Sequence, residues 1–195
     1  MPPNFLQNTN VYLIGMMGAG KSTVGKRLAE QLGYRFLDTD TVIEQTTGQP
    51  ISQIFAEQGE AAFRNLETQV LNQVSAYPRL VVATGGGMVI KQMNWSYLQY
   101  GAVVWLDVPV EQLVARLTGD VSRPLLQAPK QTADQTADQT ANLRTQLENL
   151  LAQRHGRYAQ ADIRIAHQAG EGPDAIATRI ITALKQIVKP PQKIN

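Results

Sequence analysis

The chain has 195 residues, of which 43% are hydrophobic and 17% are charged, and its formal net charge is +2. This length predicts one domain spanning residues 1–195, large enough to bury a core without disulfide bonds. So small a net charge gives no argument for a broad nucleic-acid-binding or membrane-binding surface, so we expect the function to lie in a local site. The absence of cysteine excludes a disulfide framework, a thiol nucleophile and a cysteine-based metal site.

Membrane and targeting signals are also missing from the sequence. No apolar run reaches the roughly 18 residues that cross a bilayer. Residues 1–10 lack the basic and apolar regions of a secretory signal. Only two histidines occur, too few for a histidine-rich metal site. We therefore expect a cytoplasmic monomer with no nucleic-acid or membrane partner.

Short apolar segments alternate with segments of helical periodicity along the chain. The predicted strands are residues 11–14, 36–38, 80–83, 102–108 and 163–165. The predicted helices are residues 21–32, short helices between 40 and 58 interrupted by Gly48 and Pro50, and residues 60–76, 110–117, 143–161 and 173–185. Five such alternations are typical of an α/β fold with a parallel sheet covered by helices on both faces.

Polar or glycine-rich segments follow three of the predicted strands. They are residues 15–23, residues 38–40 and the triple glycine Gly85–Gly87. In parallel α/β sheets, ligands bind beyond the carboxyl ends of the strands. We therefore expect these three segments to meet at one edge of the sheet.

The segment GMMGAGKST, residues 15–23, satisfies the pattern G-x-x-x-x-G-K-[ST] through Gly15, Gly20, Lys21 and Ser22. Glycines let successive backbone N–H groups surround phosphate oxygens, and the following helix presents its N-terminus to the same anion. Lys21 can reach the outer phosphates and the Ser22 hydroxyl can bind Mg²⁺. The segment predicts a nucleoside triphosphate site, which a GTPase, an ATPase motor and a small-molecule kinase would share.

Two observations favour the small-molecule kinase. The guanine-reading pattern Asn-Lys-x-Asp is absent, because no Asn is followed by Lys. A motor ATPase usually has a longer chain and an acidic residue at the end of a strand, for which Asp107 is a weak candidate.

Two carboxylates spaced i, i+2 follow the second predicted strand. Asp38 and Asp40 can divide the work of a kinase, one holding the Mg²⁺ shell and the other accepting a hydrogen bond from the attacking hydroxyl. Alternatively, they are capping residues of the next helix, a role that suits Asp40.

Arginines and glycines elsewhere could complete a site. Arg64 lies three residues before Glu67, which can hold its guanidinium, although a helical Arg is usually a solvated surface residue. Gly85–Gly87 permits close approach of a ligand or forms a flexible turn. Arg123, in the irregular region after residue 118, could close over the γ-phosphate or be a solvated loop residue.

Residues 131–142 repeat a four-residue unit three times, as QTAD, QTAD and QTAN. The repeat holds no apolar residue larger than Ala and cannot bury a face, so it predicts a solvated insertion, with a helical extension as the alternative.

The ordered set GMMGAGKST, LDTD, FRNLE, TGGG and RPLL, followed by an Arg near a Tyr, resembles the shikimate kinase family over residues 11–184. The resemblance implies transfer of the γ-phosphoryl group of ATP, with Mg²⁺, to the 3-hydroxyl of shikimate, a step toward chorismate and the aromatic amino acids. It implies the fold of nucleoside monophosphate kinases: a five-stranded parallel sheet in the order 2-3-1-4-5. It also implies substrate-binding helices over residues 40–76 and a mobile lid over residues 118–142.

The resemblance also assigns roles to individual residues. The implied ATP-binding residues are Gly18, Ala19, Gly20, Lys21, Ser22, Thr23, Arg116, Arg123 and Pro173. The implied shikimate-binding residues are Asp40, Arg64, Gly85, Gly86, Gly87 and Arg154. Lys21, Asp40 and Arg123 are the implied catalytic residues, with Asp40 as the base. Ser22, and Asp38 through water, are the implied Mg²⁺ ligands.

One departure from the family pattern concerns the second carboxylate-binding arginine. The family often shows Arg-x-Pro-Leu-Tyr, whereas residues 154–158 read RHGRY. Arg154 keeps the spacing to Tyr158 and is preferred over Arg157. Two alternatives to a shikimate kinase remain: a gluconate or nucleotide kinase of the same fold, and a non-catalytic P-loop protein that binds nucleotide.

Overall fold

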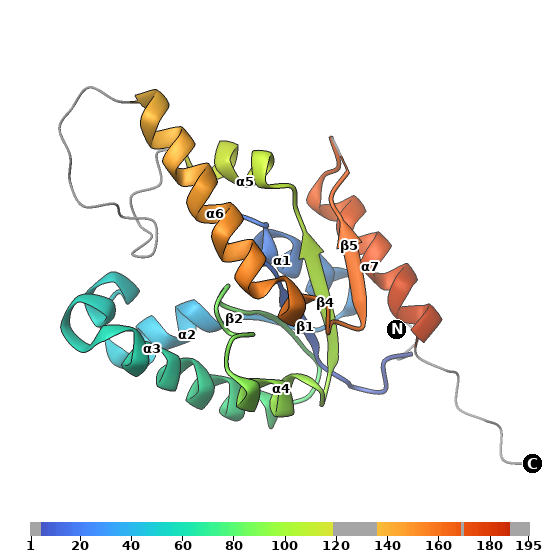
Figure 1. The fold of residues 1–195 in the computed structure, drawn as a ribbon. Helices are drawn as coiled ribbons and strands as arrows, with labels where there is room; N and C mark the ends of the chain where they lie inside the picture. Colours follow the sequence, from blue (N-terminus) through green and yellow to red (C-terminus); the bar gives the residue numbers. More distant parts are fainter. Residues whose placement is uncertain (1–4, 119–135, 169, 188–195) are drawn as a thin grey trace, which may run out of the picture.

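The computed structural model describes residues 5–118, 136–168 and 170–187 (Figure 1). The elements in chain order are β1 (Val11–Ile14), α1 (Lys21–Leu32), β2 (Arg35–Asp38), α2 (Thr39–Thr47), α3 (Ile51–Ser75), β3 (Leu80–Ala83), α4 (Gln92–Leu98), β4 (Ala102–Asp107), α5 (Val110–Leu117), α6 (Thr136–Tyr158), β5 (Ile163–Ala166) and α7 (Pro173–Ile187). The five strands form one parallel sheet in the order β2-β3-β1-β4-β5. This confirms the predicted fold class.

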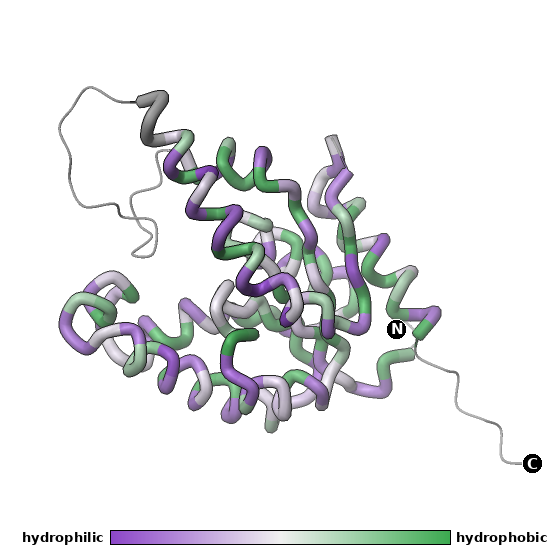
Figure 2. The backbone as a smooth tube through the Cα atoms, viewed as in Figure 1, coloured by the Kyte–Doolittle hydropathy of each residue, from purple (hydrophilic) through white to green (hydrophobic). Residues whose placement is uncertain are grey.

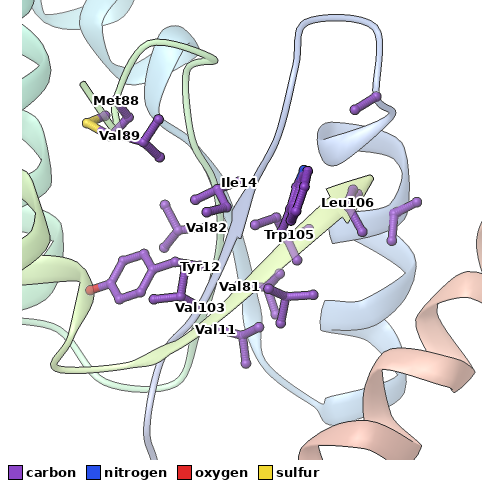
Figure 3. Close-up of a cluster of buried hydrophobic side chains, with 14 of the residues drawn as sticks. Val11, Tyr12, Ile14, Val81, Val82, Met88, Val89, Val103, Trp105 and Leu106 are labelled. Atoms are coloured by element: carbon purple, nitrogen blue, oxygen red, sulfur yellow. The ribbon is translucent and has the colours of Figure 1, made fainter. Parts of the chain in front are cut away.

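Strand β1 lies at the centre of the sheet, between β3 and β4. Val11 pairs with Val81 of β3 and with Ala102 of β4. Every residue of β1 and β3 is buried, which explains why these strands are continuous apolar runs rather than alternating ones. Figure 3 shows their side chains with Trp105 and Leu106 of β4 in one hydrophobic cluster.

Helices cover the sheet on both sides (Figure 1). Helix α1 packs against α7, α5 against α6, and α3 against α4. Figure 2 shows hydrophobic and hydrophilic stretches alternating along α3 and α6, as expected for helices with one face on the core. In the part of the chain that the structure describes, no helix is long and apolar enough to cross a bilayer.

Helix α4 was not predicted from the sequence, because its seven residues are too few to show a period. Tertiary contacts hold it. The Trp95 indole donates a hydrogen bond to the Val89 carbonyl (3.0 Å), and the Asn94 amide donates to the Met88 carbonyl (2.7 Å). Both side chains are buried, so this helix depends on its packing rather than on its propensity.

Helix α6 begins at Thr136, so the second half of the QTAD repeat is helical, as the alternative of a helical extension predicts, and residues 140–142 are exposed, as expected for a solvated segment. Residues 131–135 lie outside the described residues. The helix is anchored further along the chain, where Leu147 is fully buried and Arg144 forms a 2.8 Å ion pair with Glu111 of α5. A helix fixed by packing extends into a neighbouring segment at little cost, because propagation needs no new nucleus.

Candidate active site

The three polar segments predicted to meet do meet, in a cleft of about 860 Å³ at the carboxyl ends of β1, β2 and β3. Its lining includes Met17–Val24, Asp38, Asp40, Arg64, Glu67, Gly85–Gly87, Arg116, Arg154 and Pro173. Every described residue that the family resemblance assigned to the site therefore lines one space. Arg123, the remaining candidate, lies outside the described residues, as do residues 119–135 of the predicted lid.

The phosphate-binding segment joins β1 to α1 through backbone conformations that require glycine. Gly18 and Gly20 have φ of 75° and 87°, and Gly20, the N-cap residue of α1, has no side chain to cap the first helix N–H groups. The Lys21 ammonium donates to the carbonyls of Gly15 (2.9 Å) and Met16 (2.8 Å). The geometry is that of a nest of N–H groups with a lysine beside it, which suits an anion.

Asp38 connects this segment with the end of β2. The Ser22 hydroxyl donates to Asp38 Oδ2 at 2.5 Å, while Asp38 Oδ1 accepts from the Asp40 N–H at 3.0 Å. Asp38 is thus the N-cap of α2. The suggestion that Asp40 serves as the cap is wrong, since Asp40 lies in the first turn of α2 and lines the cleft.

Asp40 and Glu67 approach the same glycine from different helices. A Cβ atom on Gly85 would lie 2.7 Å from Asp40 Oδ1 and 2.8 Å from Glu67 Oε1. Burial raises the pKa of Glu67 to about 7, Arg64 opposes this rise, and the nearby Asp40 carboxylate adds to it. The cleft therefore holds one buried carboxyl group that titrates close to neutral pH.

Glu67 holds Arg64 in place, as the i, i+3 spacing predicts. Arg64 Nη1 donates to Glu67 Oε2 at 2.8 Å, and Arg64 Nη2 donates to Glu60 Oε1 at 2.8 Å. The Arg64 side chain is only 8% exposed, so the solvated-surface alternative is wrong. A Cβ on Gly87 would lie 2.1 Å from Arg64 Nη1, so only glycine leaves room for this guanidinium.

Arg154, rather than Arg157, enters the cleft. Its side chain is buried and donates to the Gly86 carbonyl at 3.2 Å, and the Tyr158 hydroxyl donates to the same carbonyl at 2.8 Å. Arg157 instead donates to Gln92 of α4 and does not line the cleft. Because α6 carries Arg154 and Tyr158 one turn apart, both reach the triple glycine.

The opposite end of the cleft is bounded by Arg116 of α5 and Pro173, the first residue of α7. Arg116 Nη1 donates to the Gly18 carbonyl at 3.0 Å, and its Nη2 lies 2.9 Å from His167 Nε2. His167 and Glu171 also line this end, although no motif or spacing selected them. They occupy an irregular segment between β5 and α7, where only the fold shows their position.

Asp107 does not take part in the site. It does not line the cleft, and its carboxylate pairs with Arg164 at 2.6 Å. The proposed role of Asp107 as the acidic strand-end residue of an ATPase therefore finds no support in the geometry.

A parallel sheet in this order, with a phosphate-binding loop and a cleft lined by buried arginines, defines the chain as a P-loop kinase. The family model for shikimate kinase matches residues 17–185. The chain is 51% identical to the shikimate kinase of Synechococcus elongatus, covering 94% of this chain and 90% of that protein. It belongs to the shikimate kinase family, as the sequence motifs predicted, and is an ATP-dependent kinase.

Other comparisons agree. The identity to the shikimate kinase of Nostoc punctiforme is also 51%, covering 96% of this chain and 97% of that protein. The structure of the Acinetobacter baumannii shikimate kinase in complex with shikimate matches with a TM-score of 0.84 and 39% identity, covering 95% of this chain and 98% of that one. A gluconokinase from Sinorhizobium meliloti matches with a TM-score of 0.52 at 18% identity, which shows a shared fold alone.

The raised pKa of Glu67 predicts a pH dependence of stability. Because the folded protein holds this proton up to about pH 7 and the unfolded chain releases it near 4.5, the free energy of unfolding should fall as pH rises through that window. Glu67→Gln should flatten this fall, as measured by urea unfolding between pH 4.5 and 8. Glu60→Gln, which alters the exposed partner of Arg64, should keep the wild-type slope. Equal slopes in wild type and Glu67→Gln would contradict the assignment.

Proposed function

We propose that this protein transfers the γ-phosphoryl group of ATP to the 3-hydroxyl of shikimate, giving shikimate 3-phosphate and ADP on the route to chorismate. One observation carries the proposal: a phosphate-binding loop and two buried arginines, Arg64 and Arg154, line the same cleft with Asp40 beside them. The phosphate-binding loop suits ATP, whereas the two arginines and Asp40 suit a small acid that carries hydroxyl groups.

ATP occupies the part of the cleft bounded by residues 18–23, Arg116 and Pro173 in this proposal. The phosphates lie on the N–H groups of the loop and the start of α1, where the helix dipole favours an anion. Lys21 exchanges its two carbonyl contacts for phosphate oxygens and balances charge during transfer. Arg116 and Pro173 lie on either side of the base, and Arg123 is assigned to the γ-phosphate by its sequence position.

Mg²⁺ fits the oxygen atoms at the start of α1. The Ser22 hydroxyl and the Asp38 carboxylate are hard oxygen donors only 2.5 Å apart. The described residues contain no cluster of three or more metal-ligating side chains, so these few ligands suit an ion that completes its shell with phosphate oxygens and water. Ser22 would hold the ion directly and Asp38 through water. Bound there, it would neutralise phosphate charge.

Shikimate occupies the part of the cleft beside the triple glycine. Arginine forks bind carboxylates with two parallel hydrogen bonds, and Arg64 and Arg154 offer such donors from α3 and α6. The backbone of Gly85–Gly87 lies between these arginines and Asp40, where it contacts the ring.

Asp40 accepts a hydrogen bond from the 3-hydroxyl and takes its proton as the new bond to phosphorus forms. The bond from phosphorus to the bridging oxygen breaks, and ADP leaves with that electron pair. The chemistry needs mainly alignment and charge neutralisation, which a fixed base and positive groups supply. We also place the enzyme in the cytoplasm as a monomer that acts without nucleic acid or membrane.

Two other functions would share parts of this site. A gluconate or nucleotide kinase would share the fold, but the combination of Arg64, the triple glycine and Arg154 favours shikimate. A non-catalytic nucleotide-binding protein would use Lys21 but would not need Asp40 and Arg64 in the same cleft.

The proposal is tested by measuring ADP release from ATP and Mg²⁺ with shikimate, gluconate and nucleoside monophosphates supplied separately. We expect release with shikimate alone. Release with gluconate or a nucleotide instead would identify another acceptor. Tight ATP binding with no release for any acceptor would support the non-catalytic alternative.

Asp40→Asn should lower kcat by about 100-fold or more while ATP binding stays near wild type, because only the base is lost. Steady-state kinetics and ADP calorimetry separate these two effects. Glu30→Gln, exposed on α1 and outside the cleft, is the control and should keep wild-type kcat. Wild-type turnover by Asp40→Asn would remove Asp40 as the base.

The choice between the two neighbouring arginines of α6 is tested with a matched pair. Arg154→Lys keeps the charge but loses the planar fork, and should raise the KM for shikimate about tenfold. Arg157→Lys should leave that KM unchanged, because Arg157 contacts Gln92 outside the cleft. The reverse pattern would assign the substrate carboxylate to Arg157.

A further inference from the structure

A contact between Arg116 and His167 joins two elements at the nucleotide end of the cleft. Arg116 is exposed on α5, and its guanidinium makes two hydrogen bonds, to the Gly18 carbonyl (3.0 Å) and to His167 Nε2 (2.9 Å). His167 immediately follows β5, and its backbone N–H donates to the Asp107 carbonyl at 2.8 Å. An exposed arginine loses rotamer freedom when two hydrogen bonds fix its guanidinium, so Gly18 and His167 must stabilise this conformation of Arg116.

The contact determines the protonation of the imidazole. A guanidinium has donors only, so His167 Nε2 must accept, and the neutral ring then carries its proton on Nδ1. A second proton would place an N–H on Nε2, facing the Arg116 guanidinium. The hydrogen bond would be lost, and two positive charges would lie side by side.

The charges around His167 favour the neutral ring. Arg116 approaches from α5 and Arg179 from α7, while Glu171 lies in the segment between β5 and α7. Burial lowers the pKa of His167, Arg116 and Arg179 lower it further, and Glu171 opposes them. The Glu171 carboxylate is itself paired with Arg179.

We propose that His167 is a positioning residue for nucleotide binding: its neutral ring orients Arg116 beside the phosphate-binding loop, and protonation of the ring releases Arg116 and weakens the binding of ATP and ADP. The inference rests on the proposed function, because it assumes that the nucleotide occupies the end of the cleft that Arg116, His167 and Pro173 line. It assigns a role to a residue that neither motif nor spacing selected.

The sign of the pH dependence follows from the lowered pKa. The contact is present at neutral pH and is lost as pH falls below the ordinary histidine value of about 6.5. Nucleotide affinity should therefore drop on acidification, whereas shikimate affinity should not change through this residue.

The experiment measures ADP binding by calorimetry at fixed Mg²⁺ between pH 5 and 8, with three variants. His167→Gln keeps an acceptor that does not titrate, and His167→Leu removes the acceptor. His155→Gln changes the other histidine of the chain, which is exposed and contacts the edge of Trp105. The ADP phosphates titrate in every measurement, and every variant keeps Glu67. A difference between the pH profiles of the wild type and His167→Gln therefore reports the titration of His167.

At pH 8 we expect His167→Leu to weaken ADP binding about fivefold, and His167→Gln about twofold or less. Below pH 6.5, wild type and His155→Gln should lose affinity more steeply than His167→Gln. In the wild-type protein, the ring signal of His167 should shift on ADP addition in a histidine-labelled NMR spectrum, while that of His155 stays in place.

Equal pH profiles for wild type and His167→Gln would overturn the inference, as would wild-type ADP binding by His167→Leu at pH 8. Steady-state kinetics of His167→Leu give a further test. If the KM for shikimate rises as much as the KM for ATP, His167 has a structural role, and the inference is overturned. Absence of any ADP binding by the wild-type protein would overturn both this inference and the proposed nucleotide site.

Discussion

The close approach of four side chains to the backbone of Gly85–Gly87 is the constraint on which the cleft depends. Asp40 and Glu67 lie against Gly85, Arg154 against Gly86, and Arg64 against Gly87. A Cβ at Gly85 or Gly87 would lie under 3 Å from a carboxylate or guanidinium atom, so a side chain at either position would displace Asp40, Glu67 or Arg64 from its place. The residues that line this end of the cleft lie close together because this turn occupies so little space.

Electrostatics imposes a second constraint on the same place. Two arginines are buried in the cleft, and buried charges require partners or a ligand. Arg64 receives two carboxylates from its own helix, whereas the Arg154 bond that the structure gives is to a backbone carbonyl. A bound carboxylate would give Arg154 a negative partner. The end of the cleft beside residues 18–23 presents the start of α1 and Lys21 instead, so the two ends suit different anions.

The two ends are connected through the sheet. Strands β1 and β3 are adjacent and in register, so the phosphate-binding loop and the triple glycine emerge side by side. The Tyr158 hydroxyl bonds Gly86, and its ring stacks on Trp105 of β4 with centroids 5.7 Å apart. Helix α6 is thereby fixed to the core on the side where Arg154 enters the cleft, so both ends of the cleft are built on the same sheet.

The sequence by itself determined the alternation of strands and helices, the phosphate-binding loop and the family, because these depend on local periodicity and on residues close together in the chain. It also located Asp38, Asp40, Arg64 and the triple glycine at strand ends or on a helix face. Only the tertiary structure decided that Asp38 is the helix cap and that His167 contacts Arg116, and it places Arg154, which the spacing to Tyr158 favoured over Arg157, in the cleft. The cap and the Arg116 contact depend on which side chains the fold brings together, which no local periodicity records. Helix α4 was not predicted for the same reason, because the burial of Asn94 and Trp95 and the hydrogen bond between Asn94 and Thr68 of α3 stabilise it rather than its propensity.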